Sequence, residues 1–235
     1  MNTPSALVTI MSFLLLSAVS SGTGQPPPFR TAVMEIRTIQ EEDGTRTEGI
    51  SKIWIDFEDE KYCVETEMQG RDGMAMQYVT IQNQGHVFVL NVQAKTAQEI
   101  PPDVGAGQMY GWKESPDFIR FGGVSVGLDT VAGHETEIYE YVKLEDRGSV
   151  QTEEENQAGD EKEREDGLAE IMAASGRQTH VRQWIWKGTQ FPLKTIVNEG
   201  ARQTTTETMH IVVDADIPER VFVVPKDYAI KKMQP

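Results

Sequence analysis

The sequence predicts an α+β domain that is mostly β, with its strands arranged as an antiparallel meander. Two observations predict this fold class. Short runs in which apolar and polar residues alternate recur along the chain, and Gly, Asn and Asp residues separate them. Several of these runs also carry apolar residues on both faces, which indicates a sheet that is covered on both sides or curls around an apolar interior. Such an interior could be filled by the chain's own helices or could hold a ligand.

Residues 1–24 are predicted to be a secretory signal peptide. The apolar run from Ala6 to Val19 is short for a membrane span, and Ala18-Val19-Ser20 fits a cleavage site. We therefore expect a soluble periplasmic protein with no transmembrane anchor after cleavage. Its single domain should cover residues 25–235. The chain has one cysteine, Cys63, so no disulfide can form within it.

Strands are expected in order along the remaining chain. Turn sequences at residues 41–44 and 83–85 separate early strands, and Pro101-Pro102 ends the first group. That group comprises residues 31–40, 47–58, 61–68, 74–82, 86–93 and 96–100. An irregular stretch at 103–129 follows, with a helical turn near 116–120. Strands then resume at 134–144, 179–187, 191–198 and 202–213.

An acidic insertion is expected near residues 145–167. Residues 145–170 hold eleven acidic and three basic residues, which is typical of a solvated segment. Its end, Glu161–Ser175, contains helix formers at helical spacing and predicts a short amphipathic helix. The formal net charge of the chain is −15, which argues against nucleic acid as a partner.

Aromatic residues on the strands are the candidate ligand contacts. Trp184 and Trp186 are two positions apart and therefore share one strand face. Aromatic side chains in strands more often belong to a core than to a binding site, so both interpretations stay open here. The residues that we select as candidates for lining an apolar cavity are Trp54, Phe88, Tyr139, Tyr141, Trp184 and Trp186.

No motif in the sequence points to catalysis, to a metal or to a cofactor. The four histidines, His86, His134, His180 and His210, lack the local spacing of metal ligands. Cys63 has charged neighbours on its predicted strand face, where we expect a partly exposed thiol without a catalytic role. We predict that the protein is not an enzyme and uses no metal or cofactor.

Three sequence blocks resemble a known superfamily. They are GHETEIYEY (Gly133–Tyr141), VRQWIWKGTQFPLK (Val181–Lys194) and DIPERVFVVPKDY (Asp216–Tyr228). These blocks resemble the LolA/LolB-like superfamily of outer-membrane lipoprotein carriers and receptors, in particular its uncharacterised secreted periplasmic members. The resemblance implies a curved antiparallel half-barrel, with helices covering its open face and an apolar cavity inside.

The resemblance also implies a function. We expect a soluble periplasmic protein that binds an acyl chain, a lipid or another apolar ligand in the half-barrel cavity, with a lipid or the acyl chain of a lipoprotein as its partner. The alternative is an envelope interaction or sensor module with a filled core and no ligand. In that case the partner is another envelope protein.

Overall fold

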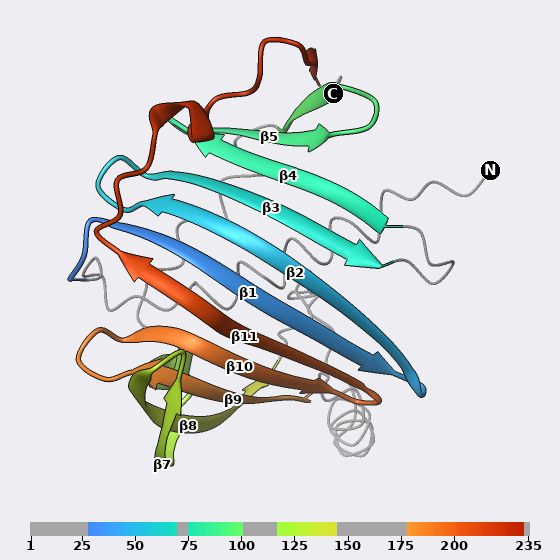
Figure 1. Ribbon diagram of the computed structural model, residues 1–235. Coiled ribbons are helices and arrows are strands. Elements are labelled where there is room, and N and C mark those ends of the chain that lie inside the picture. The colour runs from blue at the N-terminus through green and yellow to red at the C-terminus, as the bar shows by residue number, and fades with distance from the viewer. Residues whose placement is uncertain (1–27, 70–74, 101–116, 145–177, 233–235) are drawn as a thin grey trace, which may run out of the picture.

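The computed structural model describes residues 28–69, 75–100, 117–144 and 178–232. These residues form one open sheet of twelve strands in the order β12-β6-β5-β4-β3-β2-β1-β11-β10-β9-β8-β7 (Figure 1). Neighbouring strands are antiparallel, except that β12 pairs parallel to β6. The predicted antiparallel meander is therefore confirmed in two runs, β1 to β6 and β7 to β11.

The strand bounds follow the alternating segments of the sequence. The first run consists of β1 (Thr31–Glu42), β2 (Thr45–Asp56), β3 (Lys61–Gln69), β4 (Ala75–Asn83), β5 (His86–Asn91) and β6 (Thr96–Ile100). The second run consists of β7 (Val124–Val131), β8 (His134–Leu144), β9 (Gln178–Trp186), β10 (Phe191–Glu199) and β11 (Arg202–Val213). Two short helical turns, α3 (Asp117–Arg120) and η3 (Glu219–Phe222), and the short strand β12 (Ala229–Lys232) complete the described elements.

Tight turns connect the consecutive strands. Asp43 and Gly44 have φ angles of 49° and 74°, and Gln84 and Gly85 have φ angles of 50° and 80°. Two successive residues with positive φ form the type I′ turn, whose twist matches that of the flanking strands. The expected turns at these two places are thus confirmed.

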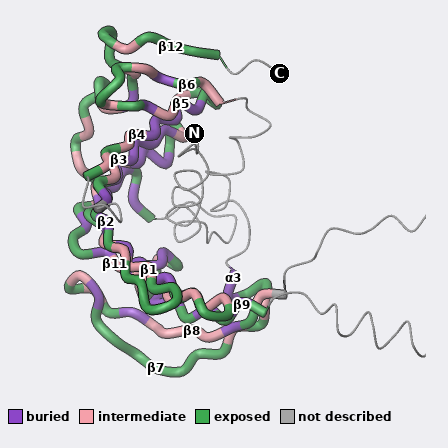
Figure 2. The backbone as a smooth tube through the Cα atoms, turned by 90° about the vertical axis from the view of Figure 1, so that its right-hand side faces the viewer, coloured by how far each residue is buried: buried purple, intermediate pink, exposed green. Residues whose placement is uncertain are grey.

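The sheet is strongly curved. Figure 2 shows it edge-on as an arc, with α3 on the concave side. Irregular pairing occurs between Glu35 and Ile36, between Pro192 and Lys194, and between Ser125 and Gly127. Such bulges increase local twist and bend a strand, and they lie in the half of the sheet that contains β7 to β11 and β1.

The segment after β11 crosses the convex side of the sheet. Figure 1 shows it passing in front of β4 and β5, and Figure 2 shows it along the outside of the arc. Phe222 is buried there against Cys63, Ile81 and Leu90. Lys61 Nζ binds Glu219 Oε2 at 3.0 Å and ties η3 to the start of β3. The convex face is therefore covered over β3 to β6 by residues far away in the sequence.

Three apolar clusters form the core. The largest joins β1, β2 and β3 to β9, β10 and β11, with Met34, Ile53, Tyr62, Trp184 and Leu193 among its buried members. The second lies under the C-terminal segment, and the third packs α3 against β8 and β9.

Two strands differ from the sequence prediction. The stretch that we expected to be irregular, up to residue 129, contains most of β7. The sequence does not reveal this strand, because seven of its eight residues are exposed and its pairing with β8 is interrupted at Val126. β12 is four exposed residues long and carries no alternation.

The helices expected over the open face are not shown by the described residues. Of the described helical turns, α3 contacts β8, and η3 contacts β3 and β4. The signal peptide, the acidic insertion and the amphipathic helix at 161–175 lie outside the described residues. Among the described helices, none is long and apolar enough to cross a membrane.

Candidate ligand-binding face

The concave face of the sheet is built from cross-strand rows of apolar side chains. Directly paired residues point to the same face, so the register identifies each row. One row runs from Ile211 on β11 through Met34, Ile53 and Val64 to Thr80 and Val89. Met34, Ile53 and Val64 are buried, and Val89 is half-buried. Beside it runs the row of Ala32, Ile55, Tyr62, Gln82 and Val87, all buried.

A polar row crosses the same face. Gln183 on β9 pairs with Thr195 on β10, which pairs with Thr206 on β11, which pairs with Thr38 on β1. We call these four residues the polar row. Their exposed fractions are 2%, 6%, 6% and 2%, so the row is as buried as the apolar core.

Several buried oxygen atoms on this face have no hydrogen-bond partner within the described part of the chain. Three belong to the polar row: Gln183 Oε1, Thr195 Oγ1 and Thr38 Oγ1. The Tyr141 hydroxyl lies in the adjacent row of the same face, and Gln82 Oε1 lies farther away, in the row of Ala32. A buried polar group without a partner costs about 1–3 kcal/mol, so such groups are normally paired. Five of them on one face indicate that something else supplies hydrogen bonds there.

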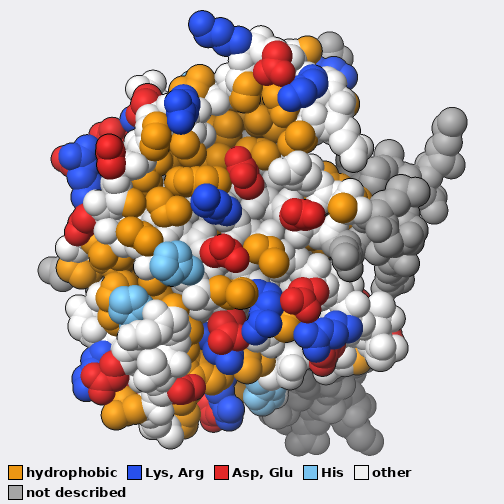
Figure 3. Space-filling view, in the orientation of Figure 1, with side chains coloured by type: hydrophobic (Ala, Val, Ile, Leu, Met, Phe, Trp, Pro, Cys, Tyr) orange, Lys and Arg blue, Asp and Glu red, His pale blue; other side chains and the backbone are white. Residues whose placement is uncertain are grey.

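The polar row and the two aliphatic rows are uncharged, and charged residues of the concave face such as Glu137 and Lys143 lie in other rows. Between Tyr139 at one end and Met76 at the other, the row that contains Thr38 has no Asp, Glu, Lys or Arg among its described residues. The convex face differs, because acidic and basic side chains are interspersed over it (Figure 3). There Glu207 binds Arg37 at 3.4 Å and Lys194 at 3.6 Å. The two faces of the sheet therefore offer different chemistry.

The helical turn α3 closes one end of the concave face. Phe118 stacks on Tyr139 with ring centroids 4.2 Å apart, and Phe121 stacks on Tyr141 at 6.1 Å. The buried Asp117 carboxylate holds Lys143 on β8. Burial raises the pKa of the Tyr141 hydroxyl above its ordinary value, so this group stays protonated and can donate a hydrogen bond.

The six residues selected from the sequence do not form one site. Tyr139 and Tyr141 lie on the concave face under α3. Trp54 and Phe88 lie on the convex face, where they pack against the cluster under the C-terminal segment. Trp184 and Trp186 belong to the largest core cluster. Whether any of the six contacts a ligand stays a prediction.

Trp184 and Trp186 share a face, as their spacing predicts, because they pair with Ile138 and Thr136 on β8. Trp184 is buried, and its Nε1 donates to Asp129 Oδ2 at 2.9 Å. A backbone hydrogen bond from Thr130, together with the one from Trp184, lowers the pKa of the Asp129 carboxyl. This hydrogen bond fixes the curled β7 against β9, which is a structural role.

Sequence reasoning missed the polar row. The signal that could have revealed it is the alternation of threonines on β11, where Thr204, Thr206 and Thr208 are buried and Gln203, Thr205 and Glu207 are not. A strand with threonine in place of aliphatic residues on its buried face is unusual, because buried residues are mostly apolar.

The expectation for Cys63 was wrong. We expected a partly exposed thiol, but Cys63 is 2% exposed and packs in the cluster under the C-terminal segment. Burial raises the pKa of the Cys63 thiol to about 12. The charged strand face seen in the sequence is covered at Cys63 by the segment that contains Phe222.

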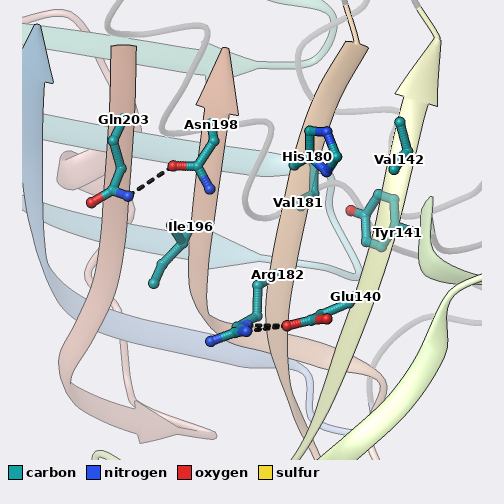
Figure 4. A pocket seen from close by; sticks show the side chains of 9 residues that line it. All are labelled: Glu140, Tyr141, Val142, His180, Val181, Arg182, Ile196, Asn198 and Gln203. Carbon is teal, nitrogen blue, oxygen red and sulfur yellow. Dashed lines mark hydrogen bonds and ion pairs between the residues drawn. The ribbon is translucent and has the colours of Figure 1, made fainter. Parts of the chain in front are cut away.

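A groove of about 520 Å³ lies at the edge of the sheet where β8 and β10 end and β9 and β11 begin. Two cross-strand rows line it: Val142, His180, Asn198 and Gln203 form one, and Glu140, Arg182 and Ile196 form the other. Figure 4 shows the ion pair of Arg182 with Glu140 and the hydrogen bond of Gln203 to Asn198, which is 2.7 Å long. These two rows lie on the face opposite to the polar row, and Tyr141 and Val181 of the concave face complete the lining of the groove.

Comparison with known proteins gives only distant similarities. No family model matches the sequence, and no curated protein matches it. An uncharacterized conserved protein from Thermus thermophilus is 9% identical with a TM-score of 0.46, over 97% of this chain and 99% of that one. A LolA superfamily protein from Nitrosomonas europaea is 6% identical with a TM-score of 0.39, over 91% and 96%. In the MucA/MucB complex of Pseudomonas aeruginosa the match is 11% identical with a TM-score of 0.41, over 91% and 59%.

One of these similar structures is a LolA superfamily protein, and the three sequence blocks resemble the same superfamily. All three similarities are low.

Proposed function

We propose that the protein is a soluble periplasmic binding protein without catalytic activity, which holds an acyl chain or another apolar ligand against the concave face of its sheet. The observation that carries the proposal is the set of uncharged rows of aliphatic side chains on the concave face. Apolar surface on the concave face favours an apolar ligand. Each Å² of apolar surface that binding removes from water contributes about 25 cal/mol of favourable free energy.

Binding of methyl decanoate, measured by calorimetry, tests this proposal. A charge on the concave face should weaken binding, because burying an unpaired carboxylate is costly. Val89 is a suitable position, since it is half-buried on this face. We expect Val89→Glu to weaken binding by about tenfold or more.

Ile50→Glu is the matched control. Ile50 is 46% exposed and pairs with Arg37, which places it on the convex face. We expect this variant to bind methyl decanoate like the unaltered protein. Equal losses in both variants, or no binding to the unaltered protein, would contradict the proposal.

The alternative, an envelope interaction module with a filled core, is favoured by a different observation. The groove at the end of β8 to β11 presents His180 and Arg182 to solvent on the convex side. In that case Arg182→Ala should weaken capture of the protein partner, and methyl decanoate should not bind.

A further inference from the structure

The polar row has a chemistry that an aliphatic chain cannot satisfy. Gln183 and Thr195 are direct partners on β9 and β10, and both have a buried oxygen without a hydrogen-bond partner among the described residues. Both side chains are more than nine-tenths buried and point to the concave face. Partner residues on neighbouring strands lie about 5 Å apart, so one small polar group can reach both.

The two side chains define which group fits. The Gln183 Oε1 atom accepts hydrogen bonds and cannot donate them, so the ligand must supply an N–H or O–H donor. The Thr195 hydroxyl can donate to a ligand acceptor. A secondary amide offers one donor and one acceptor in the same plane. An ester or an ionised carboxylate has acceptors only, so it would leave Gln183 Oε1 without a partner.

The polar row offers no charged partner to an ionic group. The row from Tyr139 through Gln183, Thr195, Thr206 and Thr38 to Gly49 contains no acidic or basic residue. A buried carboxylate, phosphate or ammonium group needs a partner of opposite charge. A neutral polar group needs hydrogen bonds alone, which this row provides.

We infer that the ligand of the concave face carries a neutral secondary amide next to its acyl chain, and that Gln183 and Thr195 bind this amide. The inference rests on the proposed function, and it narrows the ligand from any apolar molecule to an N-acyl amphiphile. The amide N–H donates to Gln183 Oε1, and the Thr195 hydroxyl donates to the amide oxygen. The acyl chain then lies over the aliphatic rows of β1 to β5.

Two ligands of the same shape test the inference. N-methyldecanamide and methyl decanoate differ by an N–H in place of an oxygen atom. A site that offers only apolar contacts prefers the ester, because the amide loses more hydration on burial. We expect the opposite order in calorimetry of the full chain, with the amide binding about tenfold more tightly. Decanoate, whose carboxylate is charged, should bind most weakly.

Variants of similar shape test whether Thr195 and Gln183 bind the amide. We expect Thr195→Val to weaken binding of the amide and of the ester alike, because the carbonyl oxygen of either ligand would accept a hydrogen bond from this hydroxyl. The ligand-free variant should be at least as stable as the unaltered protein, because an unpartnered buried hydroxyl is removed. Gln183→Met should reverse the preference. The control is Thr205→Val, which lies on the convex face of β11 and should change neither affinity.

The outcomes separate the two proposals. Equal or tighter binding of the ester would overturn the amide inference and keep the proposed function. An amide preference that survives Gln183→Met, or affinities for both ligands that survive Thr195→Val, would overturn the assignment to these residues. If neither ligand binds, both proposals are wrong.

Discussion

Burial in the folded protein alters the reactivity of the Cys63 thiol, and this change can be measured directly. It is 2% exposed, and burial raises its pKa to about 12. Near neutral pH the reactive thiolate is therefore almost absent, and reagents cannot reach the sulfur. We expect iodoacetamide to leave Cys63 unmodified in the folded protein and to alkylate it rapidly in denaturant, as followed by intact mass. Fast alkylation of the folded protein would show that the C-terminal segment does not cover this site.

Single residues also show why the candidate site was only partly predictable. The aromatic residues stood out in the sequence because they are large, yet Trp54 and Trp184 lie on the face opposite to the polar row. Alternation identifies two faces of a strand, but it does not say which face is concave. Thr195 and Gln183 attract no notice in the sequence, and their importance appears when the register joins them in one row.

At the scale of an element, the turn between α3 and β7 depends on Gly123. A Cβ atom added there would lie 2.7 Å from the Phe118 carbonyl oxygen and 2.9 Å from Phe118 Cβ. Phe118 cannot move away freely because it stacks on Tyr139. We expect Gly123→Ala to lower the free energy of unfolding by about 1–3 kcal/mol in urea denaturation.

Gly127 on β7 provides the control for this prediction. A Cβ atom there would meet Ile138 Cδ1 at 3.9 Å, which is ordinary contact. Gly127→Ala should therefore change stability by less than about 0.5 kcal/mol. Equal effects of the two substitutions would mean that the close approach at Phe118 does not constrain the turn.

Elements with strong alternation were predictable, and those without it were not. β6 and β8 have the bounds expected from sequence, because apolar and polar residues alternate between clear turns. β7 was missed because it is an exposed edge strand. Alternation of apolar and polar residues arises when one strand face is buried, and β7 has almost no buried face. The short β12 forms by pairing with β6, and no local preference specifies that contact.

At the scale of the whole molecule, the C-terminal segment stabilises the convex face. Phe222 is 2% exposed and packs against strands more than a hundred residues earlier in the chain. We expect Phe222→Ala to lower the free energy of unfolding by about 3–5 kcal/mol, because it leaves a cavity beside Ile81. The same variant should speed alkylation of Cys63. Its neighbour Val223 is 49% exposed, so Val223→Ala should neither lower the free energy of unfolding by this amount nor speed the alkylation of Cys63. Similar losses in both would contradict the role given to Phe222.

The curvature and the covering of the sheet are properties that local patterns do not contain. Bulges on β1/β11 and β9/β10 bend the sheet, and a segment distant in sequence covers its outside. The antiparallel order was predictable from short connections, since consecutive strands joined by tight turns become neighbours. The uncharged rows at the centre of the concave face and the charged convex face appear only when the strand register and the curvature of the sheet are combined.

Native mass spectrometry of the protein purified from an exporting host tests the central claim most directly. The sample should be compared before and after organic extraction, so that a bound lipid is removed without changing the chain. We predict a mass excess that disappears on extraction, with an acyl compound recovered in the extract. A bare mass under gentle conditions, unchanged after incubation with envelope lipids and N-methyldecanamide, would contradict a ligand-binding concave face.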